Sequence, residues 1–278
     1  MTDKAELVLF RSKVMHPEGA RCAHQSAVIH GPPCEKCPAC ERGICPQVGW
    51  RGLGRLFPNG FHFQARKAGA TLFHQGEPFD QVLLIRSGWV LTYKVFQDGQ
   101  RQIIRFALPG DLIGFEGDEA SGMAYSAEAI SDVALCGVKR SVFYKACTSS
   151  PHLAMNFVTA LTREALSAWN HVGALGQQTA LGRVANLLLD LHRRVAAQCE
   201  TDGPGVHLPI NQIHIADATG LTPVHVCRTL KQMRLERLLE FHKGQLVLID
   251  PYRLAEIAQL DPEVRLDRPS PVPPLAVA

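Results

Sequence analysis

Five cysteines have the residue type and the spacing to do chemistry in this chain. Four of them, Cys34, Cys37, Cys40 and Cys45, lie within twelve residues, and Cys136 lies far downstream. Thiolates this close in sequence can converge on one metal centre, because the short loops between them close at little entropic cost. A remote fifth thiol could complete the coordination sphere and tie the N-terminal arm to the rest of the protein. Such a site would suit a sensor better than a catalyst.

Composition limits what kind of protein this can be. The chain has 278 residues, enough for two domains of ordinary size, and 46% of them are hydrophobic. The net charge of +3 is too small for a protein that binds a polyanion with its whole surface, so any nucleic-acid-binding surface must be local. The chain has no run of about 18 or more apolar residues, so we expect no membrane span and no membrane partner.

The N-terminus and the cysteine count indicate the compartment. The first residues, MTDKAELVLFRSK, contain neither the long apolar segment nor the small-residue cleavage site of a secretory signal. The nine cysteines are odd in number. In a chain of this size without a signal they favour a reducing compartment, where clustered cysteines more often bind metal than form disulfides. We therefore expect a cytoplasmic protein.

The sequence contains none of the short motifs that mark common active sites. It has no H-E-x-x-H pair, no G-x-S-x-G elbow and no glycine-rich phosphate loop. Asp111, Glu116, Asp118 and Glu119 form an acidic stretch, which we interpret as a solvated loop and not as a pair of catalytic carboxylates. The sequence therefore predicts that the protein is not an enzyme.

Changes in composition divide the chain into five segments. They are an N-terminal arm with the cysteine cluster (1–50), a β-rich domain (51–150), a long helix (151–178), a second domain (179–261) and a Pro-rich tail expected to be disordered (262–278). Turn motifs recur at short intervals in the β-rich domain. The runs between these turns are strand candidates that suit a small antiparallel sandwich or barrel: Gln81–Ile85, Val90–Phe96 and Gln102–Ala107.

The segment 151–178 has the apolar spacing of a helix that pairs with another helix. From Ala154 onward, apolar residues recur at alternating steps of four and three, the a/d pattern of a heptad repeat. We call six of these residues the heptad seam: Val158, Leu161, Ala165, Ala168, Val172 and Leu175. The small Ala165 and Ala168 would allow close approach of a second helix. A buried core helix that faces the β-rich domain would show a similar pattern.

A stretch near the C-terminal end has the punctuation of a helix-turn-helix. A first helix, Gln212–Thr219, is expected to end at Gly220, where a left-handed conformation favours a residue without a side chain. Thr222 can cap the next helix, and Pro223 suits its first position because the missing N–H costs nothing there. Residues 240–250 are expected to form a hairpin, the wing of a winged helix.

The second helix of this motif has one apolar and one basic face. Val226, Leu230 and Met233 recur at helical spacing and are expected to pack on the first helix. The other face would enter the major groove of DNA, with Arg228 as the candidate for bidentate contact to guanine and Lys231 for contact to a phosphate. The predicted DNA-binding residues are Val224, His225, Cys227, Arg228, Lys231 and Arg234. A generic helix pair would need neither the glycine and proline punctuation nor the basic face.

The order of these parts resembles the Crp/Fnr superfamily of bacterial transcription regulators. The resemblance is most specific in Gly69–Gly76 (GATLFHQG), Leu84–Gly88 (LIRSG), Pro109–Phe115 (PGDLIGF) and the helix-turn-helix. It implies an α+β fold: an N-terminal β-roll like that of cyclic-nucleotide-binding domains, a long dimerisation helix and a C-terminal winged helix-turn-helix. It also implies a homodimer that binds a palindromic operator in double-stranded DNA and acts with RNA polymerase.

Within this superfamily, the chain is less similar to the cyclic-AMP receptors than to the fumarate and nitrate reduction branch. The stretch that holds the nucleotide in those receptors corresponds to Gly114–Ala129, which contains no Arg or Lys. A buried phosphodiester would therefore lack a cation. The fumarate and nitrate reduction branch instead senses oxygen, with a [4Fe–4S] cluster bound by three N-terminal cysteines and one cysteine of the β-roll.

The resemblance to this branch implies which thiols hold the cluster. Cys34, Cys37 and Cys45 match one of its spacings, C-x2-C-x7-C, and Cys136 falls where the branch places its remote ligand. The branch also shows a second spacing, C-x2-C-x5-C. Cys37, Cys40 and Cys45 come within one residue of this second spacing, so Cys40 is the alternative ligand. Loss of the cluster to oxygen or nitric oxide would then release the arm and disturb the heptad seam.

Departures from the branch leave alternatives open. Branch members usually show Glu and Ser where this chain has Val224 and Cys227, and only Arg228 is retained, so the preferred operator is expected to differ. Thiolates suit zinc as well as iron–sulfur clusters, so a zinc-stabilised DNA-binding protein is one alternative. A cluster-free regulator whose β-roll binds another small effector is the second.

Overall fold

The computed structural model describes residues 61–117, 122–198 and 205–260. The described strands are β1 (Phe61–Arg66), β2 (Thr71–Phe73), β3 (Gln81–Ser87), β4 (Val90–Val95), β5 (Arg101–Ala107), β6 (Leu112–Ile113), β7 (Ser126–Ala129), β8 (Val133–Lys139), β9 (Gly205–His207), β10 (Leu239–His242) and β11 (Gln245–Leu248). The described helices are α3 (Arg140–Ser149), α4 (Pro151–Gln177), α5 (Ala180–Ala196), α6 (Gln212–Thr219), α7 (Pro223–Leu235) and α8 (Pro251–Ile257). The clustered cysteines and the predicted disordered tail lie outside the described residues.

Strands β1–β8 form a β-roll of two antiparallel sheets. The first sheet has the strand order β1-β8-β3-β6, and the second has the order β2-β7-β4-β5. The three strands predicted from the turn pattern are present as β3, β4 and β5, with ends that differ by one or two residues. The prediction succeeded there because each strand is bounded by a turn whose residues are locally specific.

Two of these turns depend on glycine. Gly88, between β3 and β4, has a φ of 80°, and a Cβ at this position would lie 2.2 Å from the carbonyl oxygen of Asp132. Gly110 has a φ of 92° and follows Pro109, which is the pattern of a type II turn. Both positions lie in the left-handed region, where a side chain is disfavoured. The second turn leads from β5 into Asp111, whose neighbours are described below.

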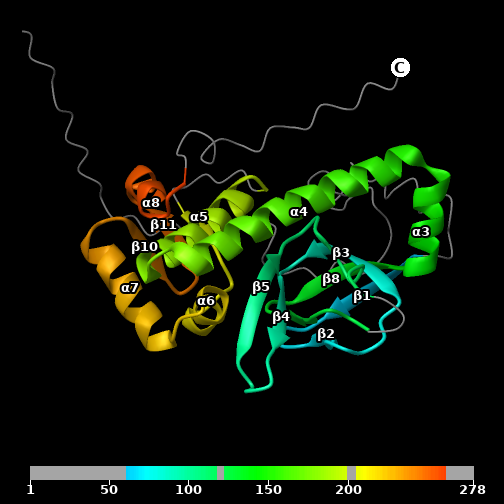
Figure 1. Ribbon diagram of the computed structural model, residues 1–278, viewed down its shortest axis with the longest axis horizontal. Helices are drawn as coiled ribbons and strands as arrows, with labels where there is room; N and C mark the ends of the chain where they lie inside the picture. Colours follow the sequence, from blue (N-terminus) through cyan, green and yellow to red (C-terminus); the bar gives the residue numbers. More distant parts are fainter. Residues whose placement is uncertain (1–60, 118–121, 199–204, 261–278) are drawn as a thin grey trace, which may run out of the picture.

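Apolar packing arranges the β-roll in layers. Its interior, between the two sheets, is filled by residues such as Ile85 and Val90. The outer face of the first sheet packs with α3 and the start of α4, where Phe143 and Leu153 are buried. The outer face of β4 and β5 instead packs toward the C-terminal domain (Figure 1).

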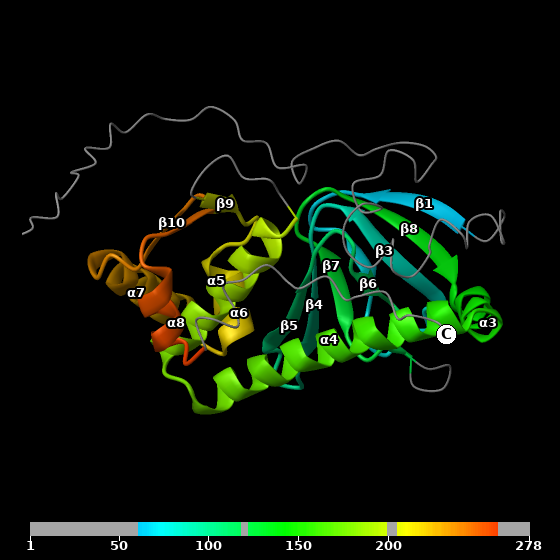
Figure 2. The ribbon, with the colours of Figure 1, turned by 90° about the horizontal axis from the view of Figure 1, so that it is seen from above.

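Helix α4 connects the two domains. It begins after Ser150, and its first turns pack on the β-roll, where the rings of Phe157 and Phe115 meet edge to face with centroids 5.4 Å apart. The helix then runs past the β-roll to the C-terminal domain (Figure 2). Only Gln178 and Thr179 separate it from α5.

The C-terminal domain and the β-roll share one apolar cluster. The cluster includes Trp89 and Phe106 of the β-roll together with Leu188 and Leu191 of α5. These contacts were not predicted from the sequence. The predicted fold, an α+β chain with a β-roll, a long helix and a C-terminal winged helix-turn-helix, is confirmed. No helix in the described part of the chain has the length and apolar character needed to cross a membrane.

Candidate nucleic-acid interface and sensor residues

Side-chain caps determine where the two helices of the helix-turn-helix begin. The Asn211 side chain accepts a hydrogen bond from the backbone N–H of His214 at 2.9 Å, and the Asn211 N–H donates back to Nδ1 of His214 at 3.4 Å. Gly220 ends α6 with a φ of 64°. Thr222 caps α7 by accepting from the backbone N–H of His225 at 3.2 Å. The helix bounds and the roles of Gly220 and Thr222 are as predicted, because caps depend on residues within one turn of the helix end.

Helix α7 divides into a buried and an exposed face. Val226, Leu230 and Met233 are buried in the core of the domain, as predicted. The six predicted DNA-binding residues are all exposed: Val224, His225, Cys227, Arg228, Lys231 and Arg234. The helix contains three cations and no carboxylate, so it is locally basic although the whole chain is nearly neutral. The contact of each residue with a base or a phosphate stays a prediction.

The predicted wing lies directly after α7. Strands β10 and β11 pair antiparallel, and β11 also pairs with β9. Lys243 and Gly244 join β10 to β11 with φ values of 47° and 80°, and two left-handed residues match the twist of a tight hairpin. A Cβ at Gly244 would lie 2.8 Å from the carbonyl oxygen of Leu208, so the close approach of β9 also requires glycine. The hairpin expected over 240–250 is present.

Cys136 is the predicted cluster ligand that lies among the described residues. It lies on β8, and its cross-strand neighbours are Phe63 on β1 and Leu84 on β3. The residue is 3% exposed and packs in the apolar cluster that contains Phe143 and Leu153. Within the described ranges, no group of three or more His, Cys, Asp or Glu could hold a metal ion. A metal at Cys136 would need ligands from outside these ranges, where the four clustered cysteines lie.

The interpretation of the acidic stretch as a solvated loop is wrong for two of its members. Asp111 forms ion pairs with Arg105 and Arg194, at 3.2 Å and 2.7 Å. Burial raises the pKa of Glu116, and the Tyr125 hydroxyl and the charge of Arg105 offset this only in part. Asp118 and Glu119 lie outside the described residues. The sequence could not show these positions, because Arg194 comes from a distant part of the chain and the contacts of Arg105 and Tyr125 depend on how the strands pack.

The same geometry bears on cyclic-nucleotide binding. Burial raises the pKa of Tyr125 well above its usual range, and the nearby charge of Glu116 adds to this effect. Arg105 acts electrostatically on both groups, but its charge is already matched by Asp111 and Glu164. Arg140 also lies at this loop, where its guanidinium donates to the carbonyl oxygens of Gly114 and Gly117 at 2.8 Å and 2.6 Å. The argument against a cyclic nucleotide therefore holds for the residues of Gly114–Ala129, whereas Arg140 brings a cation to that stretch from outside it.

Helix α4 exposes a broader apolar face than the heptad seam. Three of the seam residues are exposed: Val158, Ala168 and Val172. The other three are partly buried: Leu161, Ala165 and Leu175. Trp169 is 68% exposed, and Met155 and Leu166 are also exposed on this helix. Sequence reasoning missed these three residues. Met155 and Trp169 lie 14 residues apart, which is two heptads, and Leu166 lies three residues before Trp169, so a second heptad pattern could have found them.

A basic recognition helix, a wing and a long helix with an exposed apolar face define a DNA-binding regulator with a separate β-roll domain. Residues 63–150 match the family described as a cyclic nucleotide-binding domain, and residues 182–257 match the family described as a Crp-like helix-turn-helix domain. The chain belongs to the Crp/Fnr family of transcription regulators. These regulators bind DNA, typically as dimers, and they are not enzymes.

Relatives and solved structures agree with this assignment. The nitrogen fixation regulation protein FixK of Azorhizobium caulinodans is 35% identical over 180 residues, which cover 65% of this chain and 72% of FixK. The transcriptional activator protein FnrL of Cereibacter sphaeroides is 28% identical, over 81% of this chain and 91% of FnrL. The structure of FixK2 from Bradyrhizobium japonicum superposes with a TM-score of 0.64 and 31% identity, over 71% of this chain and 96% of that structure.

Proposed function

We propose that this protein is a homodimeric regulator that senses oxygen or nitric oxide through a [4Fe–4S] cluster on Cys34, Cys37, Cys45 and Cys136. The observation that carries the proposal is the position of Cys136, a thiol 3% exposed among aliphatic and aromatic side chains. Such a water-poor setting suits a thiolate-bound cluster. When bound, the cluster would supply reactivity toward oxygen and nitric oxide and a link between the arm and the β-roll.

The described residues supply a path from Cys136 to the dimer. Cys136 and Leu153, in the first turn of α4, belong to the same apolar cluster. A change in ligation at Cys136 would therefore disturb the packing of α4 where the helix begins. Farther along, α4 exposes Val158, Trp169 and Val172, which would pair with the α4 of a second copy. This pairing would set the spacing of the two recognition helices on a palindromic operator.

The proposed partners follow from this arrangement. The relative FnrL is described as a transcriptional activator, so we extend to this chain a role in which the DNA-bound dimer contacts RNA polymerase. Val224 at the start of α7 offers only an apolar contact, for example to a thymine methyl group. The operator is therefore expected to differ from one that is read by a glutamate at this position.

The visible spectrum of protein purified without oxygen tests the cluster. We expect a broad thiolate-to-iron absorption that bleaches in air. A colourless protein with bound zinc would instead support the zinc-stabilised alternative. A colourless protein without metal would support the regulator that binds another small effector. Either of these two results would contradict the proposal that the protein binds a cluster.

Single serine variants identify the ligands. Cys136→Ser should abolish the absorption, whereas Cys147→Ser should keep it. Cys147 is a suitable control because it packs at the edge of the same apolar cluster. Likewise, Cys34→Ser should abolish the absorption and Cys40→Ser should keep it. The reverse result for this second pair would exchange Cys34 for Cys40 in the ligand set.

A further inference from the structure

The turn after β5 aims one carboxylate at the C-terminal domain. The Asp111 backbone N–H donates to the carbonyl oxygen of Leu108 at 2.9 Å, and the Leu108 N–H donates to Oδ2 of Asp111 at 2.8 Å. Pro109 and Gly110 complete this closed turn. The side chain of Asp111 is therefore held by its own backbone before any other residue contacts it.

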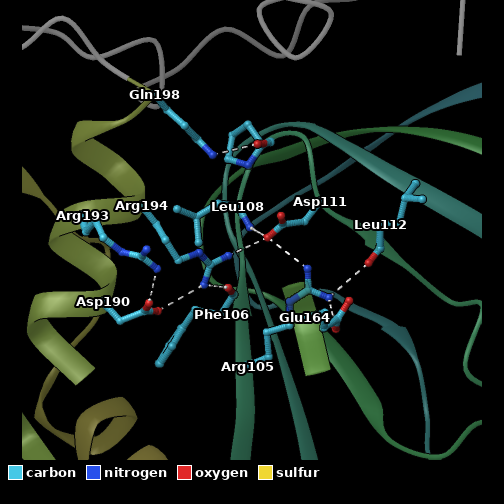
Figure 3. Close-up of polar contacts among 11 residues, drawn as sticks. Arg105, Phe106, Leu108, Asp111, Leu112, Glu164, Asp190, Arg193, Arg194 and Gln198 are labelled. Carbon is cyan, nitrogen blue, oxygen red and sulfur yellow. Dashed lines mark hydrogen bonds and ion pairs between the residues drawn. The ribbon is translucent and has the colours of Figure 1, made fainter. Parts of the chain in front are cut away.

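Two arginines from different parts of the chain converge on this carboxylate (Figure 3). Arg194 of α5 and Arg105 of β5 both reach Oδ2 of Asp111, at 2.7 Å and 3.2 Å. Arg105 also pairs with Glu164 of α4 and donates to the carbonyl oxygen of Leu112 at 3.3 Å. One corner of the β-roll is thus bonded to both the long helix and the first helix of the C-terminal domain.

Arg194 makes a second contact across the domain boundary. Its Nη1 donates to the carbonyl oxygen of Phe106 at 2.8 Å. Gln198 donates from Nε2 to the carbonyl oxygen of Pro109 at 3.0 Å, so a second side chain after the same helix meets the same turn. Arg193, the neighbour of Arg194, pairs with Asp190 inside α5. Of these two adjacent arginines, Arg194 contacts the β-roll, whereas the described ion pair of Arg193 stays within α5.

The ion pairs are strong enough to influence orientation. The side chains of Arg105, Asp111 and Arg194 are between 17% and 26% exposed, so water and salt screen them less than surface pairs. Burial opposes the charge of Arg105, but the carboxylates of Asp111 and Glu164 outweigh this and raise its pKa. Burial also raises the pKa of Glu164, which Arg105 partly offsets.

The chain itself leaves the orientation of α5 open. Gln178 and Thr179, the two residues between α4 and α5, both have extended backbone conformations, so the two helices are not one continuous rod. The shared apolar cluster holds the domains together, but apolar packing has little directional preference. Hydrogen-bonded ion pairs do have direction, and two of them cross between the domains: Arg101 with Asp217 of α6, and Asp111 with Arg194 of α5. Because α5 packs on α6 and α7, the angle of α5 determines where α7 points.

We propose that Asp111 and Arg194 are positioning residues for DNA binding, whose ion pair, shared with Arg105, sets the angle between α5 and the β-roll. Through Arg105 and Glu164 the same junction includes α4. The placement of the recognition helix is thereby tied to the packing of the β-roll and the long helix, which are the parts that a sensory event would alter. This role needs DNA binding by the family's dimer and does not depend on the cluster.

Hydrogen exchange of the full-length protein, measured by mass spectrometry without DNA, tests the junction directly. Arg194→Gln and Asp111→Asn should each raise exchange severalfold in peptides that span the α4–α5 link and α6, while β3 and β8 exchange as in the wild type. The controls are Arg193→Gln and Asp132→Asn, which remove ion pairs that lie within one domain. A rise throughout the chain would mean a purely structural role and overturn the proposal.

DNA spacing provides the functional readout. The operator is first selected from random DNA with the wild-type protein and then shifted in half-site spacing by one base pair in each direction. Arg194→Gln should lose about tenfold in affinity for the native spacing and lose most of its discrimination among spacings. The double variant Asp111→Asn/Arg194→Gln should be no weaker than either single variant. Arg194→Gln behaving like Arg193→Gln, or losses that add in the double variant, would refute the proposal.

Discussion

Single residues in the β-roll show how far chemistry can be inferred from residue type. The resemblance to the family placed Cys136 in the β-roll, and the residue lies there on strand β8. The sequence does not predict that Asp111 and Glu116 leave the solvated surface. Their environment is made by Arg105, Tyr125 and other residues that fold against them. A carboxylate next to a proline–glycine turn looks solvated in sequence whether or not a distant arginine reaches it.

Arg228 is the residue whose predicted role in base recognition can be measured most directly. Arg228→Ala should lower the preference for one base pair by about 1–3 kcal/mol, because bidentate contact to guanine would be lost. Lys231→Ala is the control and should weaken all sequences about equally and reduce the salt dependence of binding. Competition binding over single-base operator variants, at two salt concentrations, distinguishes the two. Uniform weakening by Arg228→Ala would assign that residue to a phosphate.

Gly88 allows a test of backbone strain at a single position. Gly88→Ala should destabilise the protein by about 3 kcal/mol or more, because it combines a left-handed φ with a clash against the Asp132 carbonyl. Gly99 has nearly the same φ, 81°, but has no atom within 4 Å of an added Cβ. Gly99→Ala should therefore cost only about 1–2 kcal/mol. Chemical denaturation measures both, and equal losses would show that the clash is relieved by a small shift.

At the scale of elements, helix α4 carries two roles on two faces. One face packs on the β-roll through Leu153 and Phe157, and the opposite face exposes Val158, Trp169 and Val172. The heptad seam predicted from the sequence contains Val158 and Val172 together with the small Ala165 and Ala168, but it does not contain Trp169. The exposed side chains are larger, so the dimer interface is expected to bury more apolar area than an alanine-rich seam would.

Trp169 is expected to dominate that interface. Trp169→Ala should weaken the dimer by about 2 kcal/mol, or roughly 30-fold in dissociation constant, because a large aromatic side chain at the centre of an interface contributes most. Tyr252→Ala is the matched control, since Tyr252 is 66% exposed, close to the 68% of Trp169, but lies on α8. Sedimentation of both variants over a range of concentrations measures the effect. A dimer unaffected by Trp169→Ala would place the interface on another surface.

The molecule as a whole is held together by contacts between domains. The β-roll, α4 and the C-terminal domain meet at β5, which bonds to α6 at one end and to α5 near the other (Figures 1 and 3). At the α6 end, Nε of Arg101 donates to Oδ2 of Asp217 at 2.7 Å. Because one apolar cluster runs across the boundary, a change in the packing of either domain is expected to alter the packing of the other. This continuity is what a sensor that controls DNA binding requires.

Stability should depend on pH through a histidine at this junction. Burial lowers the pKa of His171 on α4, although the charge of Asp190 and a hydrogen bond with Ala218 oppose the shift. The folded state therefore binds a proton less readily than the unfolded state. The stabilisation is present above about pH 6.5, the unfolded value, and is lost as pH falls below it.

Denaturation between pH 8 and pH 5 measures this dependence. The free energy of unfolding of His171→Gln should fall less steeply with decreasing pH than that of the wild type. The control is His152→Gln, which changes an exposed histidine on the same helix and should keep the wild-type slope. Identical slopes for all three proteins would remove His171 from the pH response.

The sequence by itself determined the local elements of this protein. Strand ends, the glycine and proline turns, the caps of α6 and α7 and the two faces of α7 all depend on residues within a few positions of one another. Such short-range preferences act in the chain whatever its surroundings, so they could be inferred with the fold class. The basic recognition face and the family followed from them.

Only the tertiary structure decided which distant residues meet. It placed Cys136 beneath the start of α4, joined Asp111 to Arg194 across 83 positions and moved the exposed apolar face of α4 toward Trp169. The reason is physical: the burial of a charge and the pairing of two charges depend on how whole elements pack. That packing is decided by apolar area summed over many residues, which no short stretch of sequence contains.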